Sequence, residues 1–343
     1  MISHELDPID LSIIKELEVD ARKPLSEVAK KLGISRHLAG RRLHSLLDRK
    51  LVTILAFTNP RALGYRTFAL TGVRVSPGSL YPVADRLTAL PNVLLVVTTT
   101  GHNDIVIWSM FADPTGLTAF LTRELGSIPG IISNETMIVL DWWVCRTFLS
   151  SPRWELMSSS PELRPADLRH DEHGVPVEPR EEGPGFRVDR IDLTILSELE
   201  QAPNASISTL AREAGISRPN ATSRLSRLIN EEITRVVGFV TPFRMGYPTA
   251  AMIGMRASPN DTNAVLEKVR SLPGVYWAAS LAGRYDLFAL AVWQDPIVLS
   301  RFLGTQLGTI PGIRDIETTI LMDTRKMNFA HIVSSHLEAV RSR

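Results

Sequence analysis

The sequence predicts an α+β protein in which one two-domain unit, helical in its first part and mixed in its second, occurs twice. An internal repeat is the first observation: IDLSIIKELE at 9–18 returns as IDLTILSELE at 191–200, 182 residues later. At this offset, without a gap from Asp7 to Asp141, 49 of 135 positions are identical. The second observation is that the same order of helix-like and strand-like patterns follows in each copy. Solenoid repeats run ~20–50 residues, so these copies are whole modules.

The composition is that of a soluble globular protein, with 343 residues, 44% hydrophobic residues, 22% charged residues and a formal net charge of +1. Apolar stretches such as Val93–Val97 are far shorter than the ~18 residues of a membrane span, so no membrane partner is expected. The single cysteine, Cys145, excludes an intramolecular disulfide and fits a reducing compartment. The N-terminus lacks the basic-then-apolar pattern of a secretory signal. We therefore expect a cytoplasmic protein.

The stretch between the copies, residues 151–186, predicts a linker, because it holds six prolines and many charges with little apolar periodicity. The other boundaries follow from the repeat. We predict helical domains at 1–58 and 187–240, mixed domains at 59–150 and 241–332, and a C-terminal tail at 333–343. Below, residues 1–150 are copy 1 and residues 187–332 are copy 2.

The first part of copy 1 shows three short helical patterns. Apolar residues recur at helical spacing from Ile9 to Leu17 and again from Leu25 to Leu32. Gly33 ends the second pattern, and Ser35 is a good N-cap for a third. Two helices separated by a short turn with glycine are typical of a helix-turn-helix motif. The alternating residues of VTILAFTNP indicate the following strand of a winged variant.

In such a motif the last helix enters the major groove of DNA, and its early residues face base edges. Arginine and asparagine can bind base edges, and arginine or serine can bind phosphate. The predicted DNA-binding residues are Ser35, Arg36, His37, Arg41, Arg42, His44, Ser217, Arg218, Asn220, Ser223, Arg224 and Arg227. Two alternatives stay open. This face can be a solvated surface of a protein-interaction module, and Arg42 and Arg224 can form structural ion pairs with Asp10 and Asp192.

The two helical domains differ in charge. Residues 7–58 carry ten Lys and Arg against seven Asp and Glu, whereas residues 189–240 carry six against seven. Phosphate contacts supply much of the affinity for DNA. We therefore expect the first helix-turn-helix to contribute more affinity than the second, so that Arg36 and Arg41 matter more than Arg218 and Arg227.

The second part of copy 1 predicts the order βαββαβ. The strand-like segments are Thr67–Val75, Val93–Thr99, Ile105–Phe111 and Glu135–Leu140, and the helix-like segments are Val83–Leu90 and Leu117–Leu125. This is the ferredoxin-like order, whose antiparallel sheet carries helices on one face. The other face needs a cover, since it would otherwise be a large exposed apolar patch. The second copy is the expected cover.

Each copy resembles the leucine-responsive/AsnC-type (Lrp/AsnC) transcription regulators. The resemblance rests on D-x-x-D-L-x-I at Asp7 and Asp189, on the Gly-Ile-Ser core at 33–46 and 215–228, and on the G-x-x-D hairpins at 101–104 and 283–286. It implies a bacterial regulator with a winged helix-turn-helix that binds double-stranded DNA, followed by a ferredoxin-like ligand-sensing domain. It also implies homo-oligomers through the sensing domains and small effectors, often amino acids, bound between them. Family members usually carry one unit per chain, so this fused chain puts the usual octamer in doubt.

Carried over from the family, the hairpin after the second strand of each sensing domain contributes to the effector pocket. The predicted effector-binding residues are Gly101, His102, Asn103, Asp104, Gly283, Arg284, Tyr285 and Asp286. Arg284 can pair with a carboxylate, and Asp104 or Asp286 can accept from an ammonium group. Alternatively, these residues only make a turn in which glycine supplies positive φ and aspartate caps the loop. Because the middle positions differ between the copies, we expect them to bind one ligand unequally.

Two other function classes compete with a regulator. Siroheme decarboxylases resemble the same fold and occur as fused two-unit chains. Such an enzyme needs His and Arg groups, and His102-Asn103 is the only similar feature in this sequence. A ligand sensor that no longer binds DNA is the other alternative. The sequence shows no catalytic triad, phosphate loop or Cys/His metal spacing. We therefore expect no enzymatic activity, no metal and no cofactor.

Overall fold

The computed structural model describes residues 6–144, 188–240, 242–329 and 331–341. The predicted linker, 151–186, lies outside the described residues. The described chain divides into two compact units: the first comprises 6–53, 139–144 and 238–321, and the second comprises 54–138, 188–237 and 322–341. Each unit therefore groups the helical domain of one copy with most of the sensing domain of the other copy. The exact domain boundaries stay a prediction.

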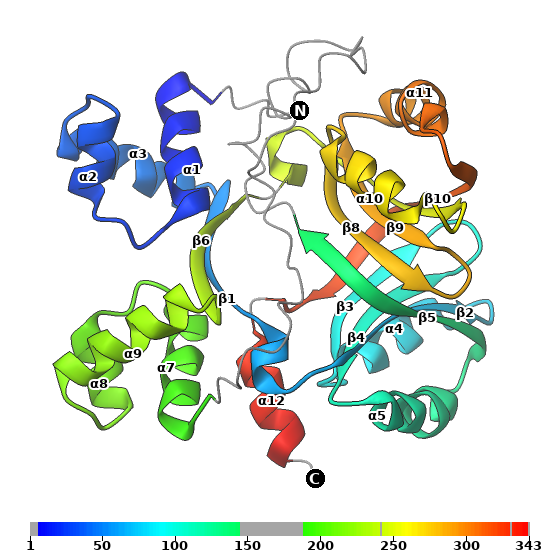
Figure 1. Ribbon diagram of the computed structural model, residues 1–343, viewed down its shortest axis with the longest axis horizontal. Helices are drawn as coiled ribbons and strands as arrows, with labels where there is room; N and C mark the ends of the chain where they lie inside the picture. Colours follow the sequence, from blue (N-terminus) through cyan, green and yellow to red (C-terminus); the bar gives the residue numbers. More distant parts are fainter. Residues whose placement is uncertain (1–5, 145–187, 241, 330, 342–343) are drawn as a thin grey trace. The chain divides into compact units, whose positions relative to one another are not determined.

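The helical domain of copy 1 consists of α1 (Pro8–Val19), α2 (Leu25–Lys31) and α3 (Arg36–Asp48), followed by strand β1 (Val52–Thr58) (Figure 1). The Asp7 carboxylate caps α1 by accepting from the backbone N–H groups of Ile9 and Asp10, at 2.9 Å each. The Ser35 hydroxyl caps α3 by accepting from the N–H of Leu38 at 3.1 Å. The predicted helix-turn-helix and its Ser35 cap are confirmed.

The helical domain of copy 2 repeats this arrangement with α7 (Arg190–Gln201), α8 (Ile207–Glu213), α9 (Arg218–Asn230) and strand β6 (Thr234–Val240). Asp189 and Asp192 form a capping box at the start of α7, in which each carboxylate accepts from the other residue's backbone N–H. The strands β1 and β6 pair as a two-stranded sheet. Next to it, Gly238 of β6 lies so close to Leu17 of α1 that a Cβ there would be 2.7 Å from the Leu17 Cβ.

The sensing domain of copy 1 has the predicted order βαββαβ. Its elements are η1 (Pro60–Leu63), β2 (Thr67–Val75), α4 (Leu80–Thr88), β3 (Val93–Thr99), β4 (Ile105–Phe111), α5 (Pro114–Ala119), η2 (Phe120–Glu124), η3 (Leu125–Ser127) and β5 (Ile131–Val144). The first three strands have the predicted bounds. The predicted helix Leu117–Leu125 is instead divided among α5, a π-helical turn and a 3-10 turn. The last strand is longer than predicted at both ends, since it starts directly after the turn at Gly130 and continues to Val144.

The sensing domain of copy 2 has the corresponding elements. They are η5 (Pro242–Met245), β7 (Thr249–Ala257), α10 (Thr262–Ser271), β8 (Val275–Ala282), β9 (Leu287–Trp293), α11 (Pro296–Thr305), η6 (Leu307–Thr309) and β10 (Ile313–Met327). In the second compact unit the strand order is β3-β4-β2-β5, and in the first it is β8-β9-β7-β10. All these neighbours are antiparallel. This is the ferredoxin-like order, so the predicted fold class is confirmed.

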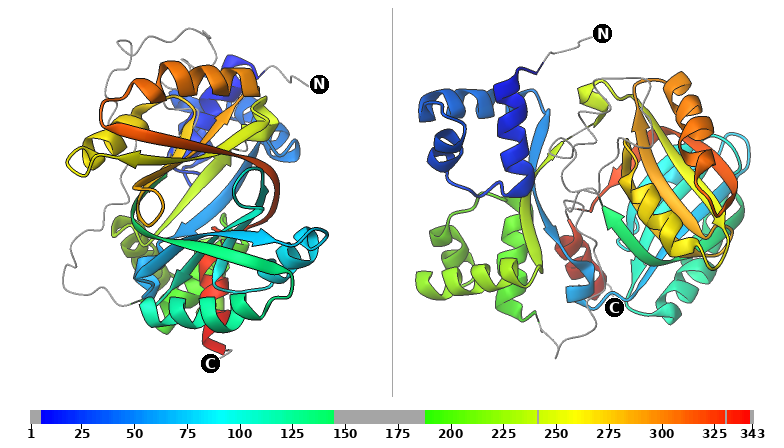
Figure 2. Two further views of the ribbon diagram at one scale, coloured as in Figure 1. Left: turned by 90° about the vertical axis from the view of Figure 1, so that its right-hand side faces the viewer. Right: turned by 45° about the horizontal axis from the view of Figure 1, so that its top comes forward.

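Helices cover one face of each sheet. Figures 1 and 2 show α10 and α11 together on one side of the strands β7–β9. On the equivalent face in copy 1, Leu87 of α4 and Phe120 after α5 pack in one buried cluster with Ile105 and Ile107 of β4. The side chains of β4 on the opposite face, among them Trp108 and Met110, are buried as well. Strand β4 is therefore buried on both faces and, apart from Ser109, is apolar along its length rather than alternating.

The longest strands, β5 and β10, each begin in one compact unit and end in the other. Residues 131–138 of β5 pair with β2, whereas 139–144 belong to the first unit, where β8 is the neighbour of β5. In the same way, β10 pairs with β7 through Ile313–Ile320, and 322–327 belong to the second unit, where β3 is its neighbour. Each four-stranded sheet thus receives a fifth strand from the other copy, which covers the edge of β8 or β3.

Two ion pairs hold these strand ends. Arg270 of α10, only 7% exposed, pairs with Asp141 of β5 at 2.7 Å. In the other unit, Arg325 of β10 pairs with Asp85 of α4 at 2.6 Å and lies over the ring of Tyr81. Each pair joins a carboxylate of copy 1 to an arginine of copy 2.

The segment predicted as a C-terminal tail forms a helix, α12 (Ile332–Arg341). It packs against α7 of the second helix-turn-helix. The buried Glu200 carboxylate at the end of α7 accepts from the backbone N–H groups of Val333 at 2.6 Å and Ser334 at 2.9 Å. Burial raises the pKa of this carboxyl, although the two N–H donors act in the opposite direction. The helix was missed because one short amphipathic pattern after a long strand does not reveal the partner that stabilises it.

We expect Glu200→Ala to lower the free energy of unfolding by about 1–3 kcal/mol, because the first N–H groups of α12 lose their buried acceptor. Urea unfolding measures the loss, and hydrogen exchange at Val333 and Ser334 should accelerate. Glu213→Ala, which removes an exposed carboxylate from α8, is the control and should change stability little. Unchanged exchange in the Glu200 variant would show that this contact does not hold α12.

Candidate functional site

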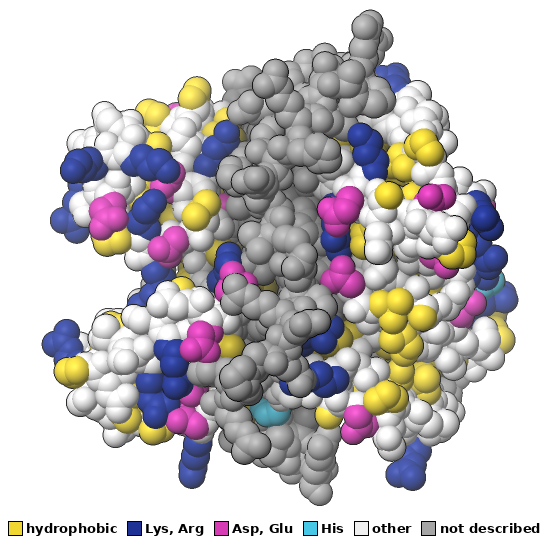
Figure 3. Space-filling model, in the orientation of Figure 1, with side chains coloured by type: hydrophobic (Ala, Val, Ile, Leu, Met, Phe, Trp, Pro, Cys, Tyr) yellow, Lys and Arg dark blue, Asp and Glu magenta, His cyan; other side chains and the backbone are white. Residues whose placement is uncertain are grey.

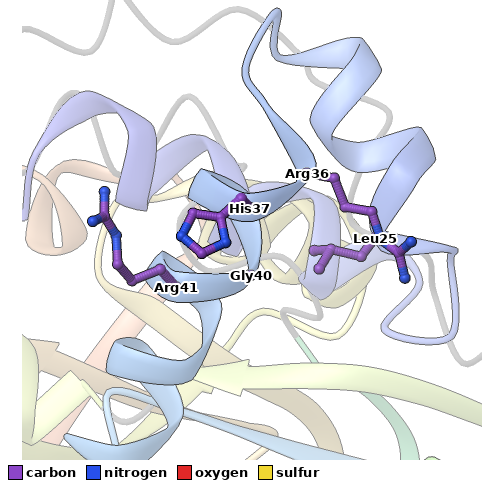
Figure 4. Close-up of a pocket in the computed structure, with 5 residues that line it drawn as sticks. All are labelled: Leu25, Arg36, His37, Gly40 and Arg41. Atoms are coloured by element: carbon purple, nitrogen blue, oxygen red, sulfur yellow. The ribbon is translucent and has the colours of Figure 1, made fainter.

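The outward face of α3 carries exposed basic residues. Arg36, His37 and Arg41 line a concavity of about 590 Å³ together with Leu25 and Gly40. Figure 4 shows Arg36 beside Leu25, with His37 and Arg41 on the other side of Gly40. Within the described part of the chain, Arg36 and Arg41 make no ion pair. Their guanidinium groups are therefore available to an anionic partner.

Three other predicted residues of α3 already have protein partners. Arg42 pairs with Asp7 at 2.6 Å and reaches Asp10 at 3.5 Å. His44 lies 3.1 Å from Asp48, one helical turn further along the same exposed face. The Ser35 hydroxyl is the N-cap of α3. For Arg42, this geometry agrees with the alternative from the sequence in which it forms a structural ion pair with Asp10.

The equivalent helix α9 has more of its charge engaged within the domain. Arg224 donates to Asp189 at 2.7 Å and to Asp192 at 2.8 Å, and Arg227 donates to Asp192 at 2.8 Å. The Asp192 side chain is completely buried. The hydrogen bonds to both carboxylates raise the pKa of Arg224.

The remaining predicted residues of copy 2 are less basic. Ser217 is the N-cap of α9, and Asn220 accepts from Arg224 Nε at 3.2 Å. Ser223 and Arg218 are exposed. Thus α3 presents Arg36 and Arg41 at two positions where α9 presents Arg218 and Ser223. Figure 3 shows several Lys and Arg side chains exposed on the surface that α1–α3 form.

The hairpin of copy 1 folds back over strand β2. Asp104 accepts from the backbone N–H of Val75 at 2.8 Å. Asn103 lies directly over Gly72, where any Cβ would overlap its amide group. His102 Nε2 is 3.9 Å from a carboxylate oxygen of Glu135 on β5, and both side chains are about 40% exposed, at 41% and 39%. The hairpin thus presents an imidazole, an amide and a carboxylate.

The hairpin of copy 2 has the same geometry with different chemistry. Asp286 accepts from the N–H of Ala257 at 2.9 Å, and the Tyr285 ring covers Gly254. Arg284 pairs with Glu317 of β10 at 2.8 Å and donates to the Tyr285 hydroxyl at 3.1 Å. Burial raises the pKa of Tyr285, and the hydrogen bond to Glu317 raises the pKa of Arg284.

In both hairpins the aspartate accepts from a backbone N–H of a strand outside the hairpin, Val75 of β2 or Ala257 of β7, and so ties the hairpin to that strand. The role of Asp104 and Asp286 toward an effector stays a prediction. The glycines Gly101 and Gly283 have φ of 90° and 153°. Sequence reasoning missed the residues that contact these hairpins. They are Gly72 and Glu135 in copy 1, and Gly254 and Glu317 in copy 2. All four are identical between the copies at the 182-residue offset, so the repeat held the signal.

Comparison with known proteins decides the family. The Lrp/AsnC ligand binding domain matches residues 69–148 and 250–330. The AsnC-type helix-turn-helix domain matches 6–47, and a winged helix-turn-helix DNA-binding domain matches 188–233. The chain is 36% identical to the HTH-type transcriptional regulator FL11 of Pyrococcus horikoshii over 136 residues, which are 39% of this chain and 89% of the relative. The chain belongs to the Lrp/AsnC family.

A second curated relative, an uncharacterised HTH-type transcriptional regulator of Pyrococcus abyssi, is 31% identical over 43% of this chain and 93% of its own length. One relative thus corresponds to about one copy of this Lrp/AsnC chain. These relatives are archaeal, so they do not support the bacterial origin that we expected. No helix among the described residues is long and apolar enough to cross a membrane. Nor do those residues contain a group of three His, Cys, Asp or Glu that could hold a metal ion.

Among solved structures, the siroheme decarboxylase NirDL matches 97% of this chain and 99% of its own, with a TM-score of 0.60 and 14% identity. At this identity the likeness shows the fold alone. Escherichia coli AsnC is 28% identical and matches 40% of this chain and 93% of its own, with a TM-score of 0.39.

We expect Arg224→Ala to lower the free energy of unfolding by about 2 kcal/mol, because the buried Asp192 carboxylate loses a charged donor. Arg36→Ala should change it by less than about 0.5 kcal/mol, because Arg36 is exposed at the start of α3. Urea unfolding of both variants provides the comparison. Equal small losses would mean that Arg224 does not position α9.

Proposed function

We propose that this Lrp/AsnC protein is a sequence-specific transcription regulator whose DNA binding is modulated by a small, amino-acid-like effector held at the sensing hairpins. The observation that carries the proposal is the exposed start of α3, where Arg36 and Arg41 stand in the frame of a helix-turn-helix. We also propose that it acts in the cytoplasm and assembles into homo-oligomers through its sensing domains, as the family resemblance implies.

The first helix-turn-helix is the stronger DNA contact in this proposal. Either kind of cation releases counterions from the DNA when it binds phosphate, but a cation that already pairs with a carboxylate must first give up that partner. Arg36 and Arg41 make no such pair, whereas Arg224 and Arg227 share the buried Asp192. The remaining cation at the start of α9 is Arg218.

We expect the double variant Arg36→Ala, Arg41→Ala to bind DNA more weakly than the matched double variant Arg218→Ala, Ser223→Ala. Each lost phosphate contact should reduce the slope of log affinity against log salt by about 1. Gel-shift titration on the upstream region of its own gene, at several salt concentrations, measures both quantities.

Equal losses in the two variants would contradict the unequal roles of the two helices. If the wild-type chain does not shift its own upstream DNA, or any DNA at low salt, the regulator proposal fails and the ligand sensor without DNA binding replaces it.

The effector half of the proposal rests on the paired groups of each hairpin. An amino acid carries a carboxylate and an ammonium group, and each hairpin offers a basic side chain beside a glutamate. In copy 2 these groups already form the pair Arg284–Glu317, which a ligand must open. In copy 1, His102 and Glu135 are further apart. Binding would change the packing of the sensing domains and thereby the placement of the helix-turn-helix pair on DNA.

We expect copy 1 to bind the effector at least about tenfold more tightly than copy 2, a difference of 1.4 kcal/mol. His102→Ala should therefore abolish binding of an amino-acid panel at low ligand concentration, and Arg284→Ala should leave this binding intact. Isothermal titration of the panel is the measurement, and Arg74→Ala, at an exposed position of β2, is the control. Loss of binding in the Arg284 variant alone would reverse the assignment.

A siroheme decarboxylase is the second candidate, and the nearly end-to-end fold likeness to NirDL favours it. Such an enzyme must bind an iron tetrapyrrole with many carboxylates. An absorbance spectrum of the purified protein after incubation with siroheme, together with a decarboxylation assay, tests this candidate separately from DNA binding.

A further inference from the structure

The concavity on α3 has an apolar floor and a basic rim. Leu25, at the start of α2, is partly exposed and forms the floor beside Gly40. Arg36, His37 and Arg41 form the rim (Figure 4). We call these five residues the α3 hollow.

Gly40 creates the α3 hollow without being needed by the fold. Glycine is unfavourable inside a helix relative to alanine. Gly40 has ordinary helical backbone geometry, so no positive φ requires it. A Cβ at this position would be 3.4 Å from the Leu25 Cδ2 atom, which is ordinary contact. A methyl group would therefore fit, but it would cover Leu25.

Copy 2 lacks the hollow's residues at the matched positions. Thr222 replaces Gly40, Pro219 replaces His37 and Ser223 replaces Arg41, while Ile207 keeps an apolar residue at the place of Leu25. Both copies keep the arginine at the start of the helix. Glycine at position 40 and the basic rim thus occur together on α3, which carries more exposed positive charge than α9.

The position of the hollow at the start of the recognition helix indicates which chemical group it binds. The early residues of this helix face base edges in the major groove. The C5-methyl of thymine is the distinctive apolar group that base pairs present in that groove. The basic rim matches the phosphates, or the acceptors of a neighbouring guanine, on either side of such a methyl group. An apolar protein segment would fit the floor but would leave two arginines without anionic partners.

We propose that the α3 hollow is a receptor for the C5-methyl group of one thymine, packed against the exposed surface of Leu25 and Gly40, with Arg36 and Arg41 binding the flanking DNA. This inference rests on the proposed function, because it requires α3 to enter the major groove. It gives Gly40 a role in base selection, which explains why a glycine stands inside a helix that alanine would stabilise more.

The experiment uses the full chain and a duplex that it enriches from a random DNA library. Each thymine of that duplex is replaced in turn by deoxyuridine, which removes the methyl group alone. One replacement should weaken wild-type binding about fourfold, the loss expected for one buried methyl group, and the others should have little effect. The variant Gly40→Thr, which carries the residue of copy 2, should bind the thymine and uracil duplexes equally.

The controls separate base selection from folding. Gly40→Ala and Gly40→Thr should unfold at the same temperature as the wild type or higher, since both residues suit a helix better than glycine. Thr222→Gly in α9 is the matched variant and should not change the response to uracil.

The outcomes are distinguishable. If uracil has no effect at any position while Arg36→Ala and Arg41→Ala still weaken binding, the methyl receptor is wrong and the proposed function stands. A uniform loss of affinity in Gly40→Thr without a uracil effect would indicate a phosphate in the hollow and would overturn the proposal. If the library yields no enriched duplex, the regulator proposal fails and the receptor fails with it. Capture of an apolar peptide instead of DNA would likewise overturn it.

Discussion

The exchanged ends of β5 and β10 are the constraint on which both sensing sheets depend. A four-stranded ferredoxin-like sheet leaves β3 or β8 as an open edge, with a row of unpaired backbone groups. Here each edge is covered by the last residues of the other copy's final strand. The ion pairs Arg270–Asp141 and Arg325–Asp85 hold those ends, with carboxylates from copy 1 and arginines from copy 2. Neither sheet is complete without the other copy.

Much of the fold can be predicted from the sequence because helix caps, turns and strand patterns are strong local signals. Short-range chemistry determines several elements: Asp7 and Ser35 cap helices, Gly33 forms a turn, and the largely apolar segment Ile105–Phe111 forms a strand. Strand exchange was not predictable in the same way. Alternation along β5 shows which side chains share a face, but it does not say which strand lies beside them. The helix α12 was not predicted for a related reason, because it is held by Glu200, which is far away in the sequence.

The candidate sites show the same division. The residue types at the start of α3 and in the hairpins could be read from motifs. Their partners could not, because an arginine on a helix looks the same whether it faces solvent or a buried carboxylate. Arg42 and Arg224 each pair with carboxylates at the start of the first helix of their domain, which ties α3 to α1 and α9 to α7. Gly40 and Thr222, which differ between the copies, lie on these tied helices.

Joining the two copies in one polypeptide has a consequence for how the protein can change over time. In a homodimer every substitution appears in both halves at once, so a twofold protein demands a twofold-symmetric site. In this chain, Gly40 can vary without Thr222, and His102 without Arg284. Symmetry is thereby relaxed while the stoichiometry of the two halves stays fixed at one to one. The DNA site of the proposed regulator can therefore be asymmetric, with a different helix on each half.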